Sequence, residues 1–169
     1  MTKKIDTVYL DMDGVLSDFM SRYRELNGDW KRDSEGREST GWKEFCQGGY
    51  FATLDTWPGS AELLQFVGRL DINVEILTST GGEKYHNQVR EDKIRWCQDH
   101  GIFYEVNTVP GRWLKKNWAR PTAILVDDTD DVVQGWIENG GIGILHTDVE
   151  KTIAELKKVL DINHEFIYN

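Results

Sequence analysis

The stretch TVYLDMDGVLSD, residues 7–18, decides the fold of this chain. Its apolar start has the composition of a buried strand, and two carboxylates, Asp11 and Asp13, follow where that strand ends. In open sheets that alternate with helices, ligands bind at the carboxyl ends of the strands. Gly14 then allows a sharp turn and a close approach of the backbone to a ligand. Two acids at such an edge predict a bound cation, although an isolated Asp-Gly pair can also simply cap a turn.

Two later apolar runs end in polar side chains in the same way. VEILTST, residues 74–80, ends in hydroxyl groups, and AILVDDTDD, residues 123–131, ends in carboxylates. Strands that alternate with helices predict an α/β, Rossmann-like parallel sheet with right-handed crossovers and helices on both faces. The acids of the first and fourth strands can meet only if those strands are neighbours, so we expect the strand order 3-2-1-4-5.

The rest of the chain supplies helices and two further strands. We expect helices at 19–27, 42–46, 58–70, 83–100, 112–119 and 132–138 and a last one after 148, with strands at 103–109 and 142–145. The segment 19–57 is too long for a plain connection between a strand and its crossover helix. The sequence therefore predicts a single domain over 1–169, with a small helical cap at about 19–57 placed over the strand ends.

Composition limits the partners and the compartment. The chain has 169 residues, a formal net charge of -9 and a pI near 4.9, which argues against stable binding to nucleic acid or to an anionic membrane. Two cysteines, Cys46 and Cys97, set no disulfide framework and favour a reducing compartment. No stretch approaches the ~20 apolar residues of a membrane span. We expect a cytoplasmic protein with a small-molecule substrate, and a homodimer stays open.

With these motifs in view, the chain resembles the haloacid dehalogenase (HAD) superfamily of phosphatases over roughly residues 5–146. The motifs of that superfamily are Asp-x-Asp-Gly after the first strand, a Ser or Thr ending the second, a Lys, and an acidic pair. The resemblance implies that Asp11 is a nucleophile that forms an aspartyl phosphate and that Asp13 is the acid/base. It also implies Mg²⁺, bound by Asp11, the backbone oxygen of Asp13 and Asp128, with Asp127 supporting the ion through water.

The remaining motif residues contact the phosphoryl group in this resemblance. Thr78, at the end of its strand, is expected to donate a hydrogen bond to a phosphoryl oxygen, and Ser79 to add a contact. Lys115 is the expected lysine of the third motif, because it precedes the fourth strand at a suitable distance. Its neighbour Lys116 and the helical Lys93, which lies on a half-buried face, are the alternatives.

Two segments narrow the resemblance to one family. FATLDTWPG, residues 51–59, and the sequence from the acidic pair to GGIGILH are similar to the 5'(3')-deoxyribonucleotidase family and its phage and bacterial relatives. This implies a nucleoside monophosphate as substrate, with its base against Phe51 and Trp57. In many of those proteins an arginine follows the acidic pair, whereas this chain has Thr129. Asp131 is expected to cap the next helix.

Two other functions stay open on the sequence. A polynucleotide 3'-phosphatase shares these motifs, but the acidic balance of the chain counts against it. A response-regulator receiver domain is a non-enzymatic phospho-acceptor module with acids at its strand ends. Receivers carry adjacent acids after strand one and an acceptor aspartate after strand three, and this chain has no such aspartate near Asn107.

Overall fold

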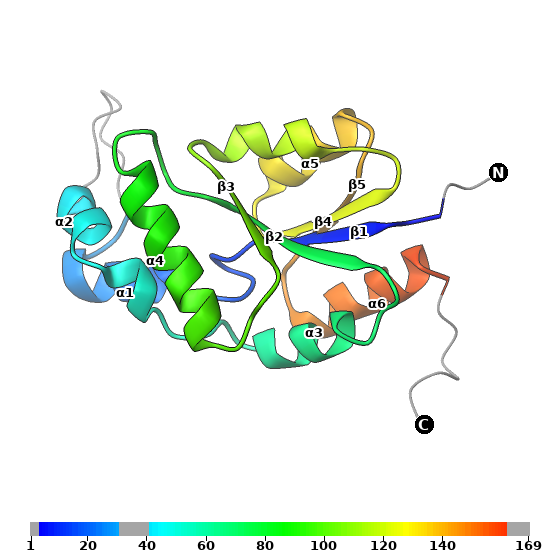
Figure 1. Cartoon of the computed structure of the whole chain (residues 1–169), viewed down its shortest axis with the longest axis horizontal. Coiled ribbons are helices and arrows are strands. Elements are labelled where there is room, and N and C mark those ends of the chain that lie inside the picture. Colours follow the sequence, from blue (N-terminus) through cyan, green and yellow to red (C-terminus); the bar gives the residue numbers. More distant parts are fainter. Residues whose placement is uncertain (1–3, 31–40, 162–169) are drawn as a thin grey trace.

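A five-stranded parallel sheet forms the centre of the molecule in the computed structural model, which describes residues 4–30 and 41–161. Its strands lie in the order β3-β2-β1-β4-β5 (Figure 1). They are β1 (Thr7–Leu10), β2 (Asn73–Ser79), β3 (Glu105–Val109), β4 (Ala123–Asp127) and β5 (Ile142–Leu145). The predicted fold class and strand order are confirmed.

The strand register brings the motif residues to one edge of the sheet. Leu10 lies opposite Ile76 on β2 and Val126 on β4. The backbone N–H of Asp11 donates to the Val126 carbonyl at 2.9 Å, so Asp11 continues the ladder between the two neighbouring strands. Because the strands are parallel, their carboxyl ends share this edge.

Helices cover both faces of the sheet. One face carries α3 (Ser60–Val67), α4 (His86–Asp99) and α6 (Val149–Val159), and the other carries α5 (Asp130–Glu138) and the 3₁₀ helix η2 (Arg112–Trp118). Alternate residues of β1 enter the two cores, Val8 and Leu10 on the first face and Tyr9 on the second. This explains the unbroken apolar runs of the sequence. Within 4–30 and 41–161, no helix is long and apolar enough to cross a membrane.

Several helix boundaries differ from the expected ones. Pro58 lies outside α3 because Gly59, with φ 80°, is the N-cap. Helix α4 begins at His86 rather than residue 83, after Gly81 and Gly82 with φ of 77° and 137°. Helix α5 begins earlier than predicted, with Thr129 as its N-cap. The prediction that Asp131 caps this helix is therefore wrong.

The segment between β1 and α3 contains α1 (Phe19–Asn27), α2 (Trp42–Gln47) and the 3₁₀ helix η1 (Tyr50–Thr53). We call the described part, 19–30 and 41–57, the inserted segment; the rest of the predicted cap, 31–40, lies outside the described residues. The inserted segment lies beside α4 (Figure 1). Its interior is a set of mutually packed rings, the aromatic cluster: Phe19, Tyr23, Trp30, Trp42, Phe45, Tyr50 and Phe51.

Candidate active site

Three carboxylates meet at the carboxyl ends of β1 and β4. Asp11, Asp127 and Asp128 each offer an oxygen within 4.8 Å of the oxygens of the other two. Asp11 and Asp127 are buried, whereas Asp128 is exposed. Oxygen ligands gathered in this way suit a hard divalent cation such as Mg²⁺. Three of the four residues predicted at the metal site are thus brought together, and the Asp13 side chain is not among them.

Lys115 lies between two of these acids. Its Nζ is 2.8 Å from Asp11 Oδ1 and 2.6 Å from Asp127 Oδ2, and only 2% of the residue is exposed. Burial alone would lower the pKa of Lys115, but the two carboxylates outweigh burial and raise this pKa. The ammonium group is therefore a fixed positive charge beside the expected nucleophile.

The two acids after β4 have different surroundings. Asp127 is occupied on both oxygens, because Oδ2 meets Lys115 and Oδ1 accepts a hydrogen bond from the backbone N–H of Thr129 at 3.0 Å. Asp128 accepts one hydrogen bond, from the Thr129 hydroxyl at 3.1 Å. Asp128 therefore has more of its carboxylate free than Asp127. That Asp128 binds the metal directly and Asp127 through water stays a prediction. Thr129 stands where many relatives have an arginine. It donates a hydrogen bond to each of the two acids and is the N-cap of α5.

Burial and like charge raise the pKa of both acids. Burial, followed by the negative charge of Asp11, raises the pKa of Asp127. Burial of the Asp128 carboxyl group, followed by the charges of Asp11 and Asp127, raises its pKa to about 7. Although Asp128 is exposed as a residue, its carboxyl group lies against Gly14. The cluster thus has more negative charge than Lys115 balances, which is the condition that favours a bound cation.

Gly14 makes this close approach possible. Its φ is 79°, in the left-handed region that glycine adopts readily, and a Cβ built on it would lie 2.0 Å from Asp128 Oδ2. The Asp-x-Asp-Gly motif therefore needs glycine both for the turn and for the space that Asp128 occupies.

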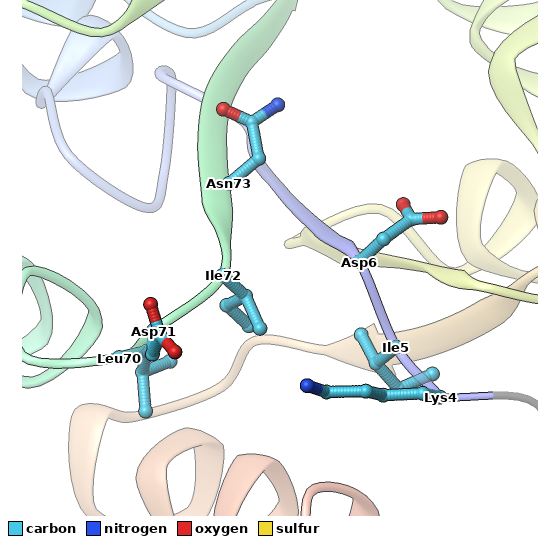
Figure 2. Close-up of a pocket in the computed structure, with 7 residues that line it drawn as sticks. All are labelled: Lys4, Ile5, Asp6, Leu70, Asp71, Ile72 and Asn73. Atoms are coloured by element: carbon cyan, nitrogen blue, oxygen red, sulfur yellow. The ribbon is translucent and has the colours of Figure 1, made fainter.

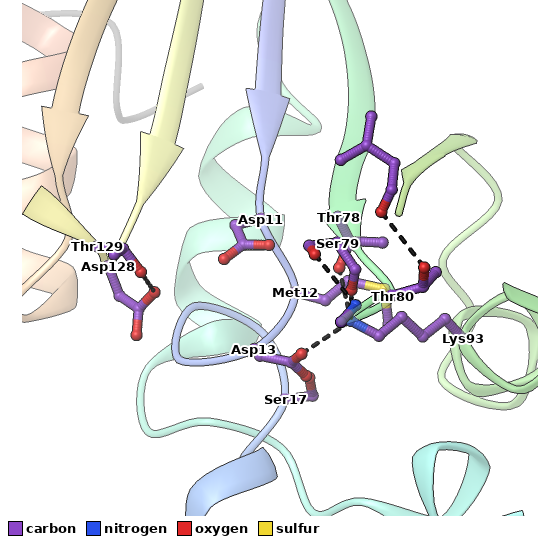
Figure 3. Close-up of polar contacts among 12 residues, drawn as sticks. Asp11, Met12, Asp13, Ser17, Thr78, Ser79, Thr80, Lys93, Asp128 and Thr129 are labelled. Carbon is purple, nitrogen blue, oxygen red and sulfur yellow. Dashed lines mark hydrogen bonds and ion pairs between the residues drawn. The ribbon is translucent and has the colours of Figure 1, made fainter. Parts of the chain in front are cut away.

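Asp13 belongs to a second cluster on the β2 side of the site (Figure 3). Its Oδ1 accepts a hydrogen bond from Ser17 Oγ at 3.1 Å, and its Oδ2 is 2.8 Å from Lys93 Nζ. Lys93 Nζ also donates to Thr78 Oγ1 at 2.7 Å and to the Ser79 carbonyl at 2.8 Å. The Asp13 side chain is thus turned away from Asp128 and toward β2.

The structure places a buried lysine beside each of the two aspartates of the Asp-x-Asp-Gly motif. Lys115 contacts Asp11 and Lys93 contacts Asp13, whereas Lys116 is exposed. The sequence marks Lys93 only as an alternative to Lys115 for the third motif, and it does not single out Ser17. The available signal was that Lys93 shares a helix face with buried residues one turn away on either side, at Val89 and Cys97.

The two aromatic residues expected to hold a base differ in exposure. Phe51 is 2% exposed and stacks on Phe19 with their ring centroids 5.5 Å apart, inside the aromatic cluster. A base-stacking role does not fit that packing. Trp57 is partly exposed, and its backbone N–H donates to the Leu16 carbonyl at 2.8 Å, in the turn that follows Asp13. Trp57 therefore stays the candidate. The Ser79 hydroxyl accepts from the Gly81 N–H at 3.2 Å, so it stabilises the loop after β2.

A separate hollow of about 560 Å³ lies at the other end of the sheet (Figure 2). It is bordered by residues 4–6, which lead into β1, and by residues 70–73, which lead into β2. The motif carboxylates follow the opposite, carboxyl ends of β1 and β4, and Lys93 and Lys115 contact them there. The hollow is thus no part of the candidate active site.

Comparisons with known proteins support the fold. Neither a scan against family models nor a search of curated proteins gave a match. The chain is similar to the structure of the HAD-hydrolase YfnB from Bacillus subtilis bound to magnesium, with 13% identity and a TM-score of 0.53 over 95% of this chain and 100% of that one. It is also similar to a structure described as a dehalogenase, with 13% identity and a TM-score of 0.52 over 96% and 100%.

A third solved structure has a similar degree of likeness. It is an uncharacterized protein from Corynebacterium glutamicum, with 16% identity and a TM-score of 0.50 over 96% of this chain and 99% of that one. At such low identities these likenesses concern the fold alone. One of these structures is a HAD-hydrolase, and the chain has the α/β Rossmann-like fold found in it.

Proposed function

We propose that this protein is a Mg²⁺-dependent phosphomonoesterase of the HAD type, acting through an aspartyl phosphate on Asp11. The observation that carries the proposal is the pairing of a three-carboxylate cluster and Lys115 with a second acid, Asp13, held on the other side of the site. Phosphoryl transfer needs a nucleophile, a proton donor and positive charge near the phosphoryl oxygens, and each has a candidate here.

In the first step Asp11 attacks phosphorus. Lys115 engages Oδ1 of Asp11, so Oδ2 is the oxygen that we assign to the attack. As the new bond between Asp11 and phosphorus forms, the bond to the leaving oxygen breaks, and Asp13 gives that oxygen a proton. Thr78 accepts a hydrogen bond from Lys93, an ammonium group that can only donate, so its own hydroxyl proton points elsewhere and can bind a phosphoryl oxygen.

In the second step the aspartyl phosphate is hydrolysed. Asp13 takes a proton from a water molecule as that water attacks phosphorus, and the bond between phosphorus and Asp11 breaks. The same carboxyl group thus serves as acid and then as base, in one position. Phosphate leaves, and Asp11 returns to its carboxylate form beside Lys115.

The donor set fits Mg²⁺. The hard oxygen ligands would be Asp11 and Asp128 with the backbone carbonyl of Asp13, and Asp127 would act through water because both its oxygens are already occupied. When bound, the ion would neutralise negative charge on the phosphoryl group. The pKa of Asp128 is raised to about 7 by burial first and then by the charges of Asp11 and Asp127, and a cation at this place would oppose that rise.

We propose a nucleoside monophosphate, most simply a deoxyribonucleotide, as the substrate. Support comes from the resemblance of the 51–59 and acidic-pair segments to the deoxyribonucleotidase family, and from the partly exposed indole of Trp57 near the turn after Asp13. A receiver domain is disfavoured, because receivers have the strand order 2-1-3-4-5 and this sheet has 3-2-1-4-5.

A phosphate-release assay tests this proposal. Purified protein would be assayed with p-nitrophenyl phosphate, 5'- and 3'-nucleoside monophosphates, sugar phosphates and 3'-phosphorylated oligonucleotides, each with MgCl₂ or excess EDTA. We expect Mg²⁺-dependent release that is fastest with a nucleoside monophosphate. Release in EDTA equal to that in MgCl₂ would refute the mechanism, and a preference for 3'-phosphorylated oligonucleotides would assign the protein as a polynucleotide 3'-phosphatase.

A further inference from the structure

Lys93 is the most completely buried cation of the described residues. It lies in the candidate active site but does not contact the carboxylate cluster of Asp11, Asp127 and Asp128. Its exposure is 0%, and its Nζ has three acceptors at 2.7 to 2.8 Å: Asp13 Oδ2, Thr78 Oγ1 and the Ser79 carbonyl. An ammonium group has three donors, so all three are used. The charge of Lys93 is thus fixed in position by β2 on one side and directed at Asp13 on the other.

We propose that Lys93 is a positioning residue for the acid/base Asp13. Together with Ser17, it holds the Asp13 carboxyl group on the β2 side and keeps it out of the carboxylate cluster of Asp11, Asp127 and Asp128 (Figure 3). This inference rests on the proposed function, and it adds a role that Lys115 does not fill.

The need for such a residue follows from the chemistry of the site. A cation bound near Asp11 attracts every carboxylate within reach, and Asp13 is only two residues away. An Asp13 carboxylate that bound the metal would no longer face the leaving oxygen. The contact with Lys93 offers Asp13 a competing positive charge on the opposite side. The Lys93 side chain is buried and the Asp13 side chain is 28% exposed, so water screens this pair only in part.

The surroundings of Lys93 show that its position is built by the fold. Helix α4 carries it, the Phe51 ring lies 5.2 Å from its Nζ, and Trp96, one turn further along α4, donates from Nε1 to the Leu54 carbonyl at 2.7 Å. The inserted segment and α4 therefore fix the lysine from two directions. A phosphoryl ligand that displaced the ammonium group would have to break three short hydrogen bonds, so Lys93 acts through Asp13.

The test compares substrates that do and do not need a proton donor. The kcat/KM value reports the steps up to phosphoryl transfer, and general acid catalysis contributes about 10² to 10⁴-fold there. With a nucleoside monophosphate, whose leaving group is an alkoxide, we expect Lys93→Met and Asp13→Asn each to lower kcat/KM at least about 100-fold. With p-nitrophenyl phosphate, a good leaving group, each loss should be about tenfold or less.

A double-variant cycle separates positioning from direct contact with phosphate. In the Asp13→Asn background, Lys93→Met should add less than about a threefold loss, because residues that act as a unit are not additive. Equal losses on both substrates that persist in the Asp13→Asn background would overturn the inference and make Lys93 a phosphoryl ligand. Arg90 lies on the exposed face of the same helix, so Arg90→Met is the matched control. It should leave kcat/KM unchanged with both substrates.

Two further measurements keep the test decisive. Mg²⁺ binding to Lys93→Met, followed by calorimetry, should be at least as tight as in wild type, since Lys93 touches none of the three clustered carboxylates and a released Asp13 carboxylate could only add a ligand. A loss of Mg²⁺ affinity in Lys93→Met as large as the loss in Asp128→Asn would contradict the inference. If Lys93→Met fails to fold, Lys93→Gln removes the charge, retains hydrogen-bond donors and should give the same difference between substrates.

Failure of the proposed function would be recognised separately. A wild type without phosphatase activity on any substrate would refute that function. The pairing would then be tested by urea unfolding of the two single variants and the double variant. Stability losses that simply add would show that Lys93 and Asp13 do not act together.

Discussion

Replacing Asp128 with Asn should stabilise the metal-free protein, although it removes a residue of the active site. The pKa of Asp128 rises from 3.8 to about 7 in the folded protein because of burial and the charges of Asp11 and Asp127. A group whose folded pKa is raised favours folding only in its protonated form. Folding therefore loses stability as pH rises from about 4 to about 7, and the full cost is present above that range.

The magnitude follows from the pKa shift, reduced for exposure. A shift of this size corresponds to at most about 4 kcal/mol at roughly 1.4 kcal/mol per pKa unit. Because Asp128 is an exposed residue, solvent screens the interaction, and we expect Asp128→Asn to raise the free energy of unfolding by about 1 to 2 kcal/mol at pH 8. Asn keeps the shape and can still accept the hydrogen bond from Thr129.

Urea unfolding in EDTA at pH 8 and pH 4 would measure this effect. The gain should be present at pH 8 and nearly absent at pH 4, where wild-type Asp128 is neutral in the folded state. Asp130→Asn is the control, because Asp130 is exposed and lies outside the carboxylate cluster. Saturating MgCl₂ should reverse the order at pH 8, since ligand at 100 times its Kd stabilises wild type by about 2.7 kcal/mol. A loss of stability at pH 8, or an equal gain at both pH values, would refute the reasoning.

Four further variants test other parts of the site. Asp11→Asn should lower kcat by at least about 10³-fold in a phosphate-release assay, because the nucleophile is gone; undiminished turnover would exclude the aspartyl phosphate. Lys115→Met should destabilise the protein by about 3 to 5 kcal/mol in urea, since it leaves buried acids uncompensated, and a change under 1 kcal/mol would contradict that account. Gly14→Ala should weaken Mg²⁺ binding at least about tenfold by calorimetry. The alanine Cβ would collide with the Asp128 carboxyl group, and the positive φ at residue 14 would strain the backbone. Trp57→Ala should raise KM for nucleotides about 10- to 100-fold and leave the kcat/KM for p-nitrophenyl phosphate nearly unchanged. Equal losses of kcat/KM on both substrates would show that Trp57 has only a structural role.

The sheet and its carboxylates were predictable from short-range patterns. A strand buried on both faces appears as an unbroken apolar run, and parallel topology fixes where its end must lie. Asp11, Asp127 and Asp128 therefore meet for reasons visible in 7–18 and 123–131. The strand order followed from the single requirement that these acids lie side by side.

What the sequence could not decide depends on contacts between distant segments. Lys93 and Lys115 both lie on helical segments. Only the packing of α4 against the inserted segment, and of η2 against the sheet and α5, shows that both are buried. Phe51 was expected to face a base, but Phe19, far away in the sequence, covers its ring. Asp131 was expected to cap α5, and instead it pairs with Arg112 of η2 at 2.9 Å.

The contacts between α4 and the inserted segment bear on how substrate reaches the site. The indole of Trp96 binds the Leu54 carbonyl, the Trp42 ring fills the space where a side chain on Gly81 would lie, and Phe51 covers Lys93. The inserted segment cannot swing outward as a hinged lid without breaking the Trp96 hydrogen bond and exposing the Lys93 charge. The two elements should open as one cooperative unit in hydrogen exchange, with similar protection of α2 and α4 amides. Substrate would then reach the site without an outward swing of the inserted segment.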